Sequence, residues 1–187
     1  MQKNILIYGL ISGVIVSIIM LFSMNYYSHC EGNVNWNTSM LIGYASMLIA
    51  FSMVFVGIRN YRDKFNKGVI SFGKAFKIGI LIVLIASTIY VVSWLICYFF
   101  FIPDFMEKYG AQEIENMKTS GATMTEIESK AKEIAEFTKM YKNPFFNAMM
   151  TYAEILPVGL IVTLISSLIL KRKTIKRIIN LKYFFIL

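Results

Sequence analysis

Charged residues are scarce in this chain of 187 residues. Asp, Glu, Lys and Arg make up 16% of it, against about 25% in soluble domains, while apolar residues make up 57%, against about 45–50%. Too little polar surface remains to coat a water-soluble globule, and the large apolar fraction excludes a disordered chain. With a mean hydropathy of +0.59, the composition indicates an integral membrane protein.

Residues that carry chemistry are scarce as well. The chain has two cysteines, Cys30 and Cys97, and one histidine, so no disulfide framework is indicated. Its only His–Cys cluster is His29-Cys30-Glu31, in which consecutive side chains point in different directions, whereas zinc needs three or four converging ligands. The sequence contains no phosphate loop, nucleophile elbow or catalytic triad. We therefore expect no enzyme, no bound metal and no cofactor.

Four long apolar runs dominate what is present. Each is close to the roughly 20 residues that a helix needs to cross a bilayer. Lipid offers no partner to backbone polar groups, so each run must be helical, and none alternates as a barrel strand would. The predicted spans are residues 5–24, 40–58, 78–102 and 145–170. The sequence thus predicts an all-α integral membrane protein in which residues 1–187 form a single four-span domain. We expect the first run to be retained, because it is longer than a signal-peptide core and no small-x-small cleavage pattern follows it.

The distribution of Lys and Arg predicts the orientation. One precedes the first span and none follows it, while the second loop, the third loop and the tail (171–187) carry six each. Placing both termini in the cytoplasm puts 13 of the 19 on the inside, as the positive-inside rule favours. We predict a multi-pass protein of a bacterial cytoplasmic membrane. The net charge of +8 then reflects topology, so we expect no nucleic-acid partner.

The only sizeable loop, residues 103–144, is predicted to be an extracytoplasmic helical hairpin between the third and fourth spans. Two patterns of the capping-box type predict where its helices begin: Asp104 with Glu107, and Thr123 with Glu126. Ser120-Gly121 separates the two helices. The first is the less strongly indicated, because Gly110 interrupts it. The hairpin either caps the outer ends of the spans or docks a partner.

The second hairpin helix carries an apolar stripe at spacings of three and four residues. Its members are Met124, Ile127, Ala131, Ile134, Thr138 and Tyr141. Two pairs at i,i+4, Glu126–Lys130 and Glu128–Lys132, have the favourable orientation. Asn143-Pro144 then predicts the start of the last span, as N-cap and first-turn proline.

The second loop and the tail alternate basic with apolar residues, a pattern typical of the head-group layer. Apolar anchors in the loop are Phe65, Val69, Ile70, Phe72, Ala75 and Phe76. Candidate contacts to anionic lipid are Arg59, Arg62, Lys64, Lys67, Lys74, Lys77, Lys171, Arg172 and Lys173. The alternative is that these charges only fix topology.

Small residues four apart predict faces where helix backbones approach closely. The clearest are Gly9, Gly13 and Ser17 in the first span and Gly159, Thr163 and Ser167 in the fourth. Such faces pack either within the chain or in a homodimer. Cys97 is expected to be apolar filler in the third span. Five aromatic residues are predicted to form a belt at the outer interface: Tyr26, Tyr27, Trp36, Trp94 and Tyr98.

Glu154 is the one ionisable residue inside a span, and Pro157 follows it. It lies nine residues into the run that begins at Phe145, which is about 13 Å at 1.5 Å per residue, in the outer half of the bilayer. The proline leaves the Ala153 carbonyl without its usual partner and is expected to bend the helix. The pair is a candidate intramembrane polar site, serving either a proton or cation or a structural hydrogen bond.

Three segments resemble a known family: GYASMLIAFSMVFVGIRNYRDKFNKGVISFGKAFKIG (Gly43–Gly79), IPDFMEKY (Ile102–Tyr109) and the end from Tyr141 to Lys173. The most specific element combines Tyr61-Arg62-Asp63-Lys64 with Phe72-Gly73-Lys74-Ala75-Phe76. Together they resemble the bacterial inner-membrane family called domain of unknown function 4199, common in Bacteroidota. The resemblance implies a small multi-span membrane protein and assigns no activity or catalytic residue.

These observations favour a non-enzymatic membrane component that self-associates or binds a larger membrane complex. One alternative is a small oligomeric transporter or channel that uses Glu154. Another is an accessory subunit of an envelope lipid or glycan enzyme, acting through the basic face. The expected partners are the lipid bilayer, including anionic head groups, and a second copy or another membrane protein.

Overall fold

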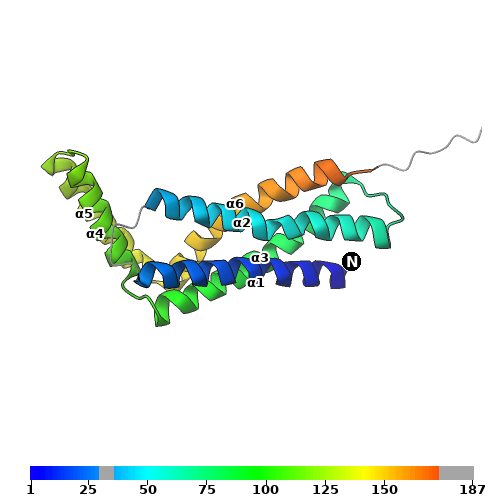
Figure 1. The fold of residues 1–187 in the computed structure, drawn as a ribbon, viewed down its shortest axis with the longest axis horizontal. Coiled ribbons are helices and arrows are strands. Elements are labelled where there is room, and N and C mark those ends of the chain that lie inside the picture. Colours follow the sequence, from blue (N-terminus) through cyan, green and yellow to red (C-terminus); the bar gives the residue numbers. More distant parts are fainter. Residues whose placement is uncertain (30–35, 173–187) are drawn as a thin grey trace, which may run out of the picture.

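A computed structural model describes residues 1–29 and 36–172, with side chains described for 1–24 and 41–172 (Figure 1). The elements are α1 (Gln2–His29), α2 (Trp36–Asn60), the π-helix η1 (Tyr61–Phe65), α3 (Phe72–Phe100), α4 (Phe105–Thr119), α5 (Met124–Tyr141) and α6 (Pro144–Leu170). The described residues contain no strand, only an isolated antiparallel bridge between Ile70 and Arg172. The predicted all-α class is confirmed for this part of the chain.

Four helices are long and apolar enough to cross a membrane: α1, α2 with η1, α3 and α6. They correspond to the four predicted spans. The largest differences lie on either side of the second loop: the second span continues through η1 to Phe65 instead of ending at residue 58, and α3 begins at Phe72 instead of residue 78. Ser71 is its N-cap and accepts a hydrogen bond from the Lys74 N–H at 3.3 Å. The prediction excluded charged residues from the span, so it began after Lys77. The helix starts earlier and includes the basic residues Lys74 and Lys77.

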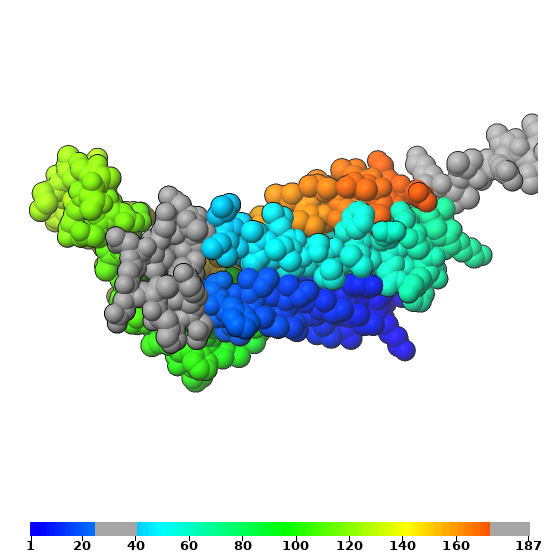
Figure 2. Space-filling view, in the orientation of Figure 1, coloured from blue at the N-terminus to red at the C-terminus, as the bar shows by residue number. Residues whose placement is uncertain are grey.

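These four helices form a bundle in which each long helix has two main neighbours. α1 packs against α2 and α3, and α6 also packs against α2 and α3. Phe51, Ile58 and Ile82 are among the fully buried core residues. The outward faces remain apolar, with Phe22 74% and Leu41 70% exposed. Such a surface suits contact with lipid chains. Figure 2 shows α1, α2 and α6 side by side on one face of the bundle.

At the end opposite the N-terminus, α4 and α5 lie side by side and extend beyond the bundle (Figure 1). We call this the α4–α5 end. α5 begins with the predicted capping box: the Thr123 N–H donates to Glu126 Oε2 at 2.8 Å, and the Glu126 N–H donates to Thr123 Oγ1 at 3.4 Å. Ser120 ends α4 and Gly121 has φ +81°, so the predicted break between the helices is confirmed.

The predicted capping box at Asp104 is wrong. Its side chain makes no capping hydrogen bond and instead pairs with Lys108 at 2.8 Å. The reason lies in the backbone, because Asp104 has φ −92° and ψ 7° and lacks the extended conformation of an N-cap. α4 begins at Phe105 all the same, and it continues through Gly110.

Gly110 does not interrupt α4. It is the position at which α5 contacts α4 closely. A Cβ atom on it would lie 2.5 Å from Ile134 Cγ2, so only glycine permits this approach of α5 to α4. The apolar stripe of α5 is buried unevenly. Met124, at its start, is 82% exposed, whereas Tyr141, at its end, is 9% exposed. Only the last turns of α5 reach the bundle.

One of the two predicted ion pairs on α5 forms. Lys132 lies 3.1 Å from Glu128, as expected. Lys130 pairs with Glu133 at 3.0 Å and not with Glu126, because the Glu126 carboxylate is held in the capping box. α6 begins as predicted: the Asn143 side chain accepts hydrogen bonds from the first turn, and Pro144 is the first helical residue.

Candidate functional site

A buried hydrogen-bond network joins α3, α5 and α6 where the bundle meets the α4–α5 end. The Trp94 indole N–H lies 3.0 Å from Asn147 Oδ1 and 3.2 Å from the Tyr141 hydroxyl. Asn147 Nδ2 donates to the Tyr141 carbonyl at 3.4 Å, and the Thr151 hydroxyl donates to the Asn147 carbonyl at 2.9 Å. Asn147 is fully buried. Because a buried polar group costs free energy unless it is bonded, this network fixes the three helices relative to one another.

An aromatic cluster surrounds the network. The Trp94 ring meets Phe105 of α4 edge-on at a centroid distance of 5.3 Å, and Tyr98 meets Tyr141 of α5 in the same way at 5.3 Å. Phe137 of α5 meets the ring of Phe146 at 5.8 Å. Both helices of the α4–α5 end are therefore held to the bundle by aromatic contacts, and α5 is held by hydrogen bonds as well.

The prediction that Trp94 and Tyr98 belong to an aromatic belt at the outer interface is wrong. Both are buried, at 7% and 1% exposed, and both point into the protein. Their position in the sequence predicts how deep in the membrane they lie. It does not predict which face of the helix carries them. The side chains of Tyr26, Tyr27 and Trp36 lie outside the described residues.

Glu154 lies one turn beyond Thr151 on α6. The spacing of Asn147, Thr151 and Glu154, by four and then three residues, places them along one side of the helix. Glu154 is exposed at the bundle surface, and no cation of the described chain pairs with it. It lies within electrostatic range of the buried hydroxyls of Tyr90 and Tyr141. α6 continues through the neighbouring Pro157, which is exposed. Asn147, Thr151 and Glu154 thus form a line along α6. It runs from the buried network to a carboxyl group that pairs with no cation of the described chain.

The predicted small-residue faces pack within the chain. A Cβ atom on Gly9 would lie 2.8 Å from Ile85, and one on Gly13 would lie 2.7 Å from Ile89, so both glycines let α1 approach α3 closely. Gly159 meets Val83 of α3. Ser17, Thr163 and Ser167, the remaining members, are also buried.

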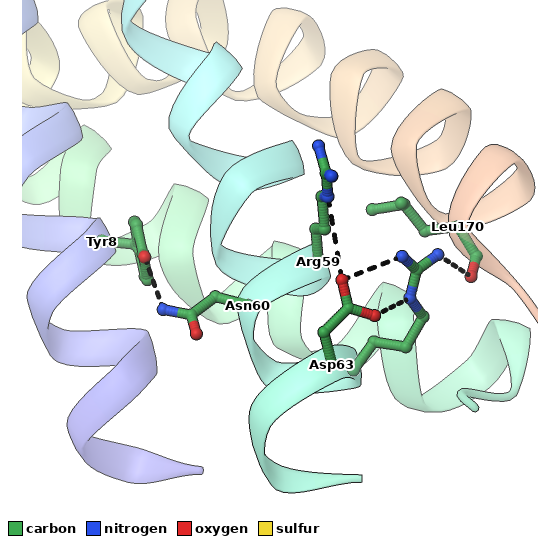
Figure 3. Close-up of polar contacts among 6 residues, drawn as sticks. Tyr8, Arg59, Asn60, Asp63 and Leu170 are labelled. Atoms are coloured by element: carbon green, nitrogen blue, oxygen red, sulfur yellow. Dashed lines mark hydrogen bonds and ion pairs between the residues drawn. The ribbon is translucent and has the colours of Figure 1, made fainter. Parts of the chain in front are cut away.

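The opposite end of the bundle is closed around Arg62. We call it the basic end; it comprises residues 1–4, 59–77 and 170–172. The Arg62 guanidinium bonds both carboxylate oxygens of Asp63, at 2.7 and 3.1 Å, and donates to the Leu170 carbonyl at the end of α6 at 3.4 Å (Figure 3). Ile70 and Arg172 exchange two backbone hydrogen bonds, at 3.0 and 2.9 Å. Side-chain and main-chain contacts therefore both tie the second loop to the last helix.

A second polar contact at this end joins α1 to α2. Asn60 Nδ2 donates to the Tyr8 hydroxyl at 2.6 Å (Figure 3). The Lys74 ammonium donates to Asn66 Oδ1 at 3.1 Å and lies 5.2 Å above the Tyr61 ring. Residues that carry the most specific part of the resemblance noted in the sequence are thus among those that build this end of the bundle.

The nine predicted lipid contacts differ in their availability. Arg62 is buried, with 10% of its side chain exposed, so it has a structural role. Arg59 lies 3.7 Å from Asp63, and Lys74 is engaged as described above. The exposed members without such contacts are Lys64, Lys67, Lys77 and Lys171. Arg172 is exposed and lies within electrostatic range of Asp63, and Lys173 lies outside the described residues. The predicted apolar anchors also divide, because Ile70 and Ala75 are buried while Phe65 and Phe72 are exposed.

Metal-ligating side chains do not gather in the part of the chain that the structure describes. No group of three His, Cys, Asp or Glu residues there is arranged to hold a metal ion. Cys97 is a buried free thiol. Cys30 and Glu31, with the cluster they form, lie outside the described residues.

The Asn147 network was missed from the sequence. Charge counting does not detect Asn147, because its amide is neutral and it lies within an apolar run. A single amide among apolar residues was the available signal, since such a group needs a partner in the bilayer. Arg62 was counted as one surface charge of several, although its neighbour Asp63 is the only acid of the second loop.

Comparison with known proteins gives one match. The model of a family described as "Protein of unknown function (DUF4199)" matches residues 7–172. No curated protein and no solved structure matches the chain.

Proposed function

Because the chain belongs to the DUF4199 family, whose description assigns no activity, we propose a function from its own geometry. The protein is a non-enzymatic membrane component whose four-helix bundle presents the α4–α5 pair to a second copy of the chain or to another membrane protein. Its four apolar helices support the membrane part of this proposal.

The observation that supports this proposal is the way in which the α4–α5 pair is joined to the bundle. Trp94, Tyr141 and Asn147 connect three helices through buried hydrogen bonds. The far tip of the pair has no such support, and Met124 there is 82% exposed. A rigid base with an exposed tip suits a binding element that must be held in one direction.

The proposed setting is a bacterial cytoplasmic membrane with both termini in the cytoplasm and the α4–α5 pair outside. The excess of Lys and Arg in the segments assigned to the inside supports this orientation. A membrane-impermeant thiol reagent applied to intact spheroplasts is then expected to label Cys30, in a variant that lacks Cys97. Labelling that requires lysis would contradict the orientation.

Site-specific crosslinking tests the binding proposal. A photoreactive amino acid at Met124, in the full chain expressed in its native membrane, is expected to give a discrete protein adduct. The same amino acid at Phe22, which is 74% exposed on α1, is the matched control and is expected to give none. Co-expression of two differently tagged copies distinguishes a homo-oligomer from a different partner.

The connection to the bundle is tested with Trp94→Phe, which replaces the indole by a smaller aromatic ring and removes the N–H donor. We expect less of the Met124 adduct at an unchanged amount of protein in the membrane. The proposal would be overturned if no adduct formed from Met124, nor from the same photoreactive amino acid placed at Ile127 or Met117.

A second candidate function, transport of a proton or cation, rests on Glu154. It is an intramembrane carboxyl without a described cationic partner, close to Tyr90 and Tyr141. If the carboxyl carries the ion, Glu154→Gln abolishes flux in proteoliposomes under a proton or sodium gradient. Glu136→Gln, an exposed change on α5, is the control and leaves flux unchanged. A parent protein without flux excludes this function.

A further inference from the structure

Lysines are treated differently at the two ends of the molecule. On α4 and α5 and the residues beside them, five of the six lysines pair with acids at 2.8–3.7 Å: Lys108, Lys118, Lys130, Lys132 and Lys142. At the basic end the single acid, Asp63, is already shared by Arg59 and Arg62. None of the exposed lysines at this end lies within ion-pair distance of a carboxylate of the described chain.

The unpaired lysines of the second loop are close in sequence to exposed aromatic rings at the ends of the membrane spans. Phe65 ends one span and Phe72 begins the next. Both rings are exposed, at 63% and 36%. Lys64 and Lys67 flank the first ring in sequence, and Lys77 follows the second by little more than one helical turn. An aromatic ring facing lipid chains with an ammonium group beside it suits the boundary between hydrocarbon and head groups.

The bridge between Ile70 and Arg172 brings a further cation to this surface. Because the two backbones are bonded at 2.9 and 3.0 Å, Lys171 is held beside the second loop. Lys171 is exposed and, like Lys64, Lys67 and Lys77, pairs with no acid of the described chain. Four ammonium groups from two distant segments are therefore collected at one end of the bundle.

We propose that this surface binds the phosphate head groups of anionic phospholipids, through Lys64, Lys67, Lys77 and Lys171. The bound lipid lies with its head group on the lysines and its chains beside Phe65 and Phe72. Arg62 takes no part, since its guanidinium is buried and already bonded to Asp63 and the Leu170 carbonyl. The proposal is independent of any role of the α4–α5 pair.

Lipid is the occupant that the position of the surface favours. The cations adjoin the apolar outer faces of two membrane-spanning helices, where head groups are present at high local concentration. A role in topology acts during insertion, whereas lipid binding is measured on the folded protein. The two roles can therefore be separated in the folded protein.

The experiment uses the full chain in vesicles of phosphatidylcholine that contain spin-labelled phosphatidylglycerol or spin-labelled phosphatidylcholine. The ratio of the protein-bound to the free spectral component gives the relative affinity for each lipid. We expect the parent protein to favour phosphatidylglycerol and added sodium chloride to weaken that preference. Each nearby lysine is worth roughly fivefold in affinity.

The variant Lys64→Gln/Lys67→Gln/Lys77→Gln is expected to reduce the preference at least about tenfold, given that per-lysine factor. The matched control, Lys118→Gln/Lys132→Gln/Lys139→Gln, removes the same number of charges from α4 and α5 and is expected to leave it unchanged. Thermal unfolding of both variants in detergent verifies that the fold is retained.

Three outcomes would overturn the proposal. In the first, the parent protein shows no preference for phosphatidylglycerol, so the lysines serve topology only. In the second, both triple variants lower the preference equally, so net charge alone acts. In the third, inorganic phosphate displaces the lipid more strongly than chloride of equal ionic strength, so the surface is a site for free phosphate.

Discussion

The two ends of the bundle are closed by different kinds of contact. The basic end uses charge: Arg62 joins Asp63 to the Leu170 carbonyl, and a main-chain bridge lies beside it. The α4–α5 end uses neutral groups, with an indole, a phenol and a carboxamide bonded to one another and enclosed by aromatic rings. Each closure brings together elements that are far apart in the sequence.

The difference follows from where water is available. Arg62 lies beside an exposed carboxylate, so its charge is only partly desolvated. Asn147 is fully buried, at a depth where an ionised group would cost several kcal/mol. A neutral network satisfies its own donors and acceptors without that cost. The comparison predicts that the neutral closure is the more sensitive to mutation, because water cannot replace a hydrogen bond that its buried groups lose.

The largest expected effect comes from Trp94→Ala. It removes two hydrogen-bond contacts and the ring contacts to Tyr98 and Phe105. We expect a loss of about 3–5 kcal/mol, as for other buried aromatic residues, seen as a lower midpoint of thermal unfolding in detergent. Phe100→Ala on the same helix is the control, since Phe100 is 79% exposed, and it is expected to change the midpoint little. Equal midpoints for the two variants would contradict the closure.

Arg62→Gln tests the charged closure and is expected to cost less. It removes the hydrogen bond to Leu170, worth on the order of 1 kcal/mol. Protease sensitivity of the second loop is expected to increase, because its tie to α6 is weakened. Lys64→Gln, in the same loop but without an ion pair among the described contacts, is the control. If the two variants behave alike, the Arg62 contacts do not hold this end together.

Gly110→Ala tests the contact between α4 and α5. A Cβ atom would come within 2.5 Å of Ile134 Cγ2, and overpacking of this kind costs about 1–3 kcal/mol, partly offset by the helix propensity of alanine. We expect a net loss of about 1 kcal/mol, measured as increased proteolysis within α4 and α5. Gly73→Ala is the matched control, since its Cβ would meet nothing within 4 Å. Restoration of protease resistance by Ile134→Ala in the Gly110 variant would identify the clash.

The smallest expected effect is a pH dependence at the α4–α5 end. The Lys142 ammonium, 2.9 Å from Glu107, holds the pKa of that carboxyl below its ordinary value of 4.5, and nearby Asp104 acts in the opposite direction. A lowered folded-state pKa gives stability that is full above about pH 4.5 and is lost as the pH falls through the lowered value. Both side chains are about half exposed, so the effect is roughly 0.2–1 kcal/mol. Thermal unfolding between pH 7 and pH 3 is expected to show a smaller acid loss in Glu107→Gln, and an unchanged acid loss in Glu136→Gln.

The long elements could be predicted from the sequence because the bilayer restricts the solutions. An uncharged run of sufficient length has to be a helix, so the four spans were found without any knowledge of their contacts. Local signals worked where the backbone conformation is set by a few neighbouring residues, as at Thr123, Ser120-Gly121 and Asn143-Pro144. The same signal failed at Asp104, whose backbone is set by the turn out of α3.

The candidate site could be predicted only in part, because it depends on which helices become neighbours. Glu154 was found as an isolated charge. Asn147 and Trp94 become recognisable as a pair only when α3 and α6 are adjacent. The side of a helix on which an aromatic residue lies is likewise decided by packing, which is why Trp94 and Tyr98 were expected at the lipid interface and are found inside.

The ion pair at the basic end also bears on how the chain is made. Arg62 and the Leu170 carbonyl are 108 residues apart, and Leu170 is the last residue of α6. During synthesis Arg62 therefore enters the membrane region long before that acceptor exists. Its other partner, Asp63, is the next residue to be added, so this pair does not depend on α6. The bond from Arg62 to the Leu170 carbonyl forms only with the last helix, so the span made last completes the closure of the basic end.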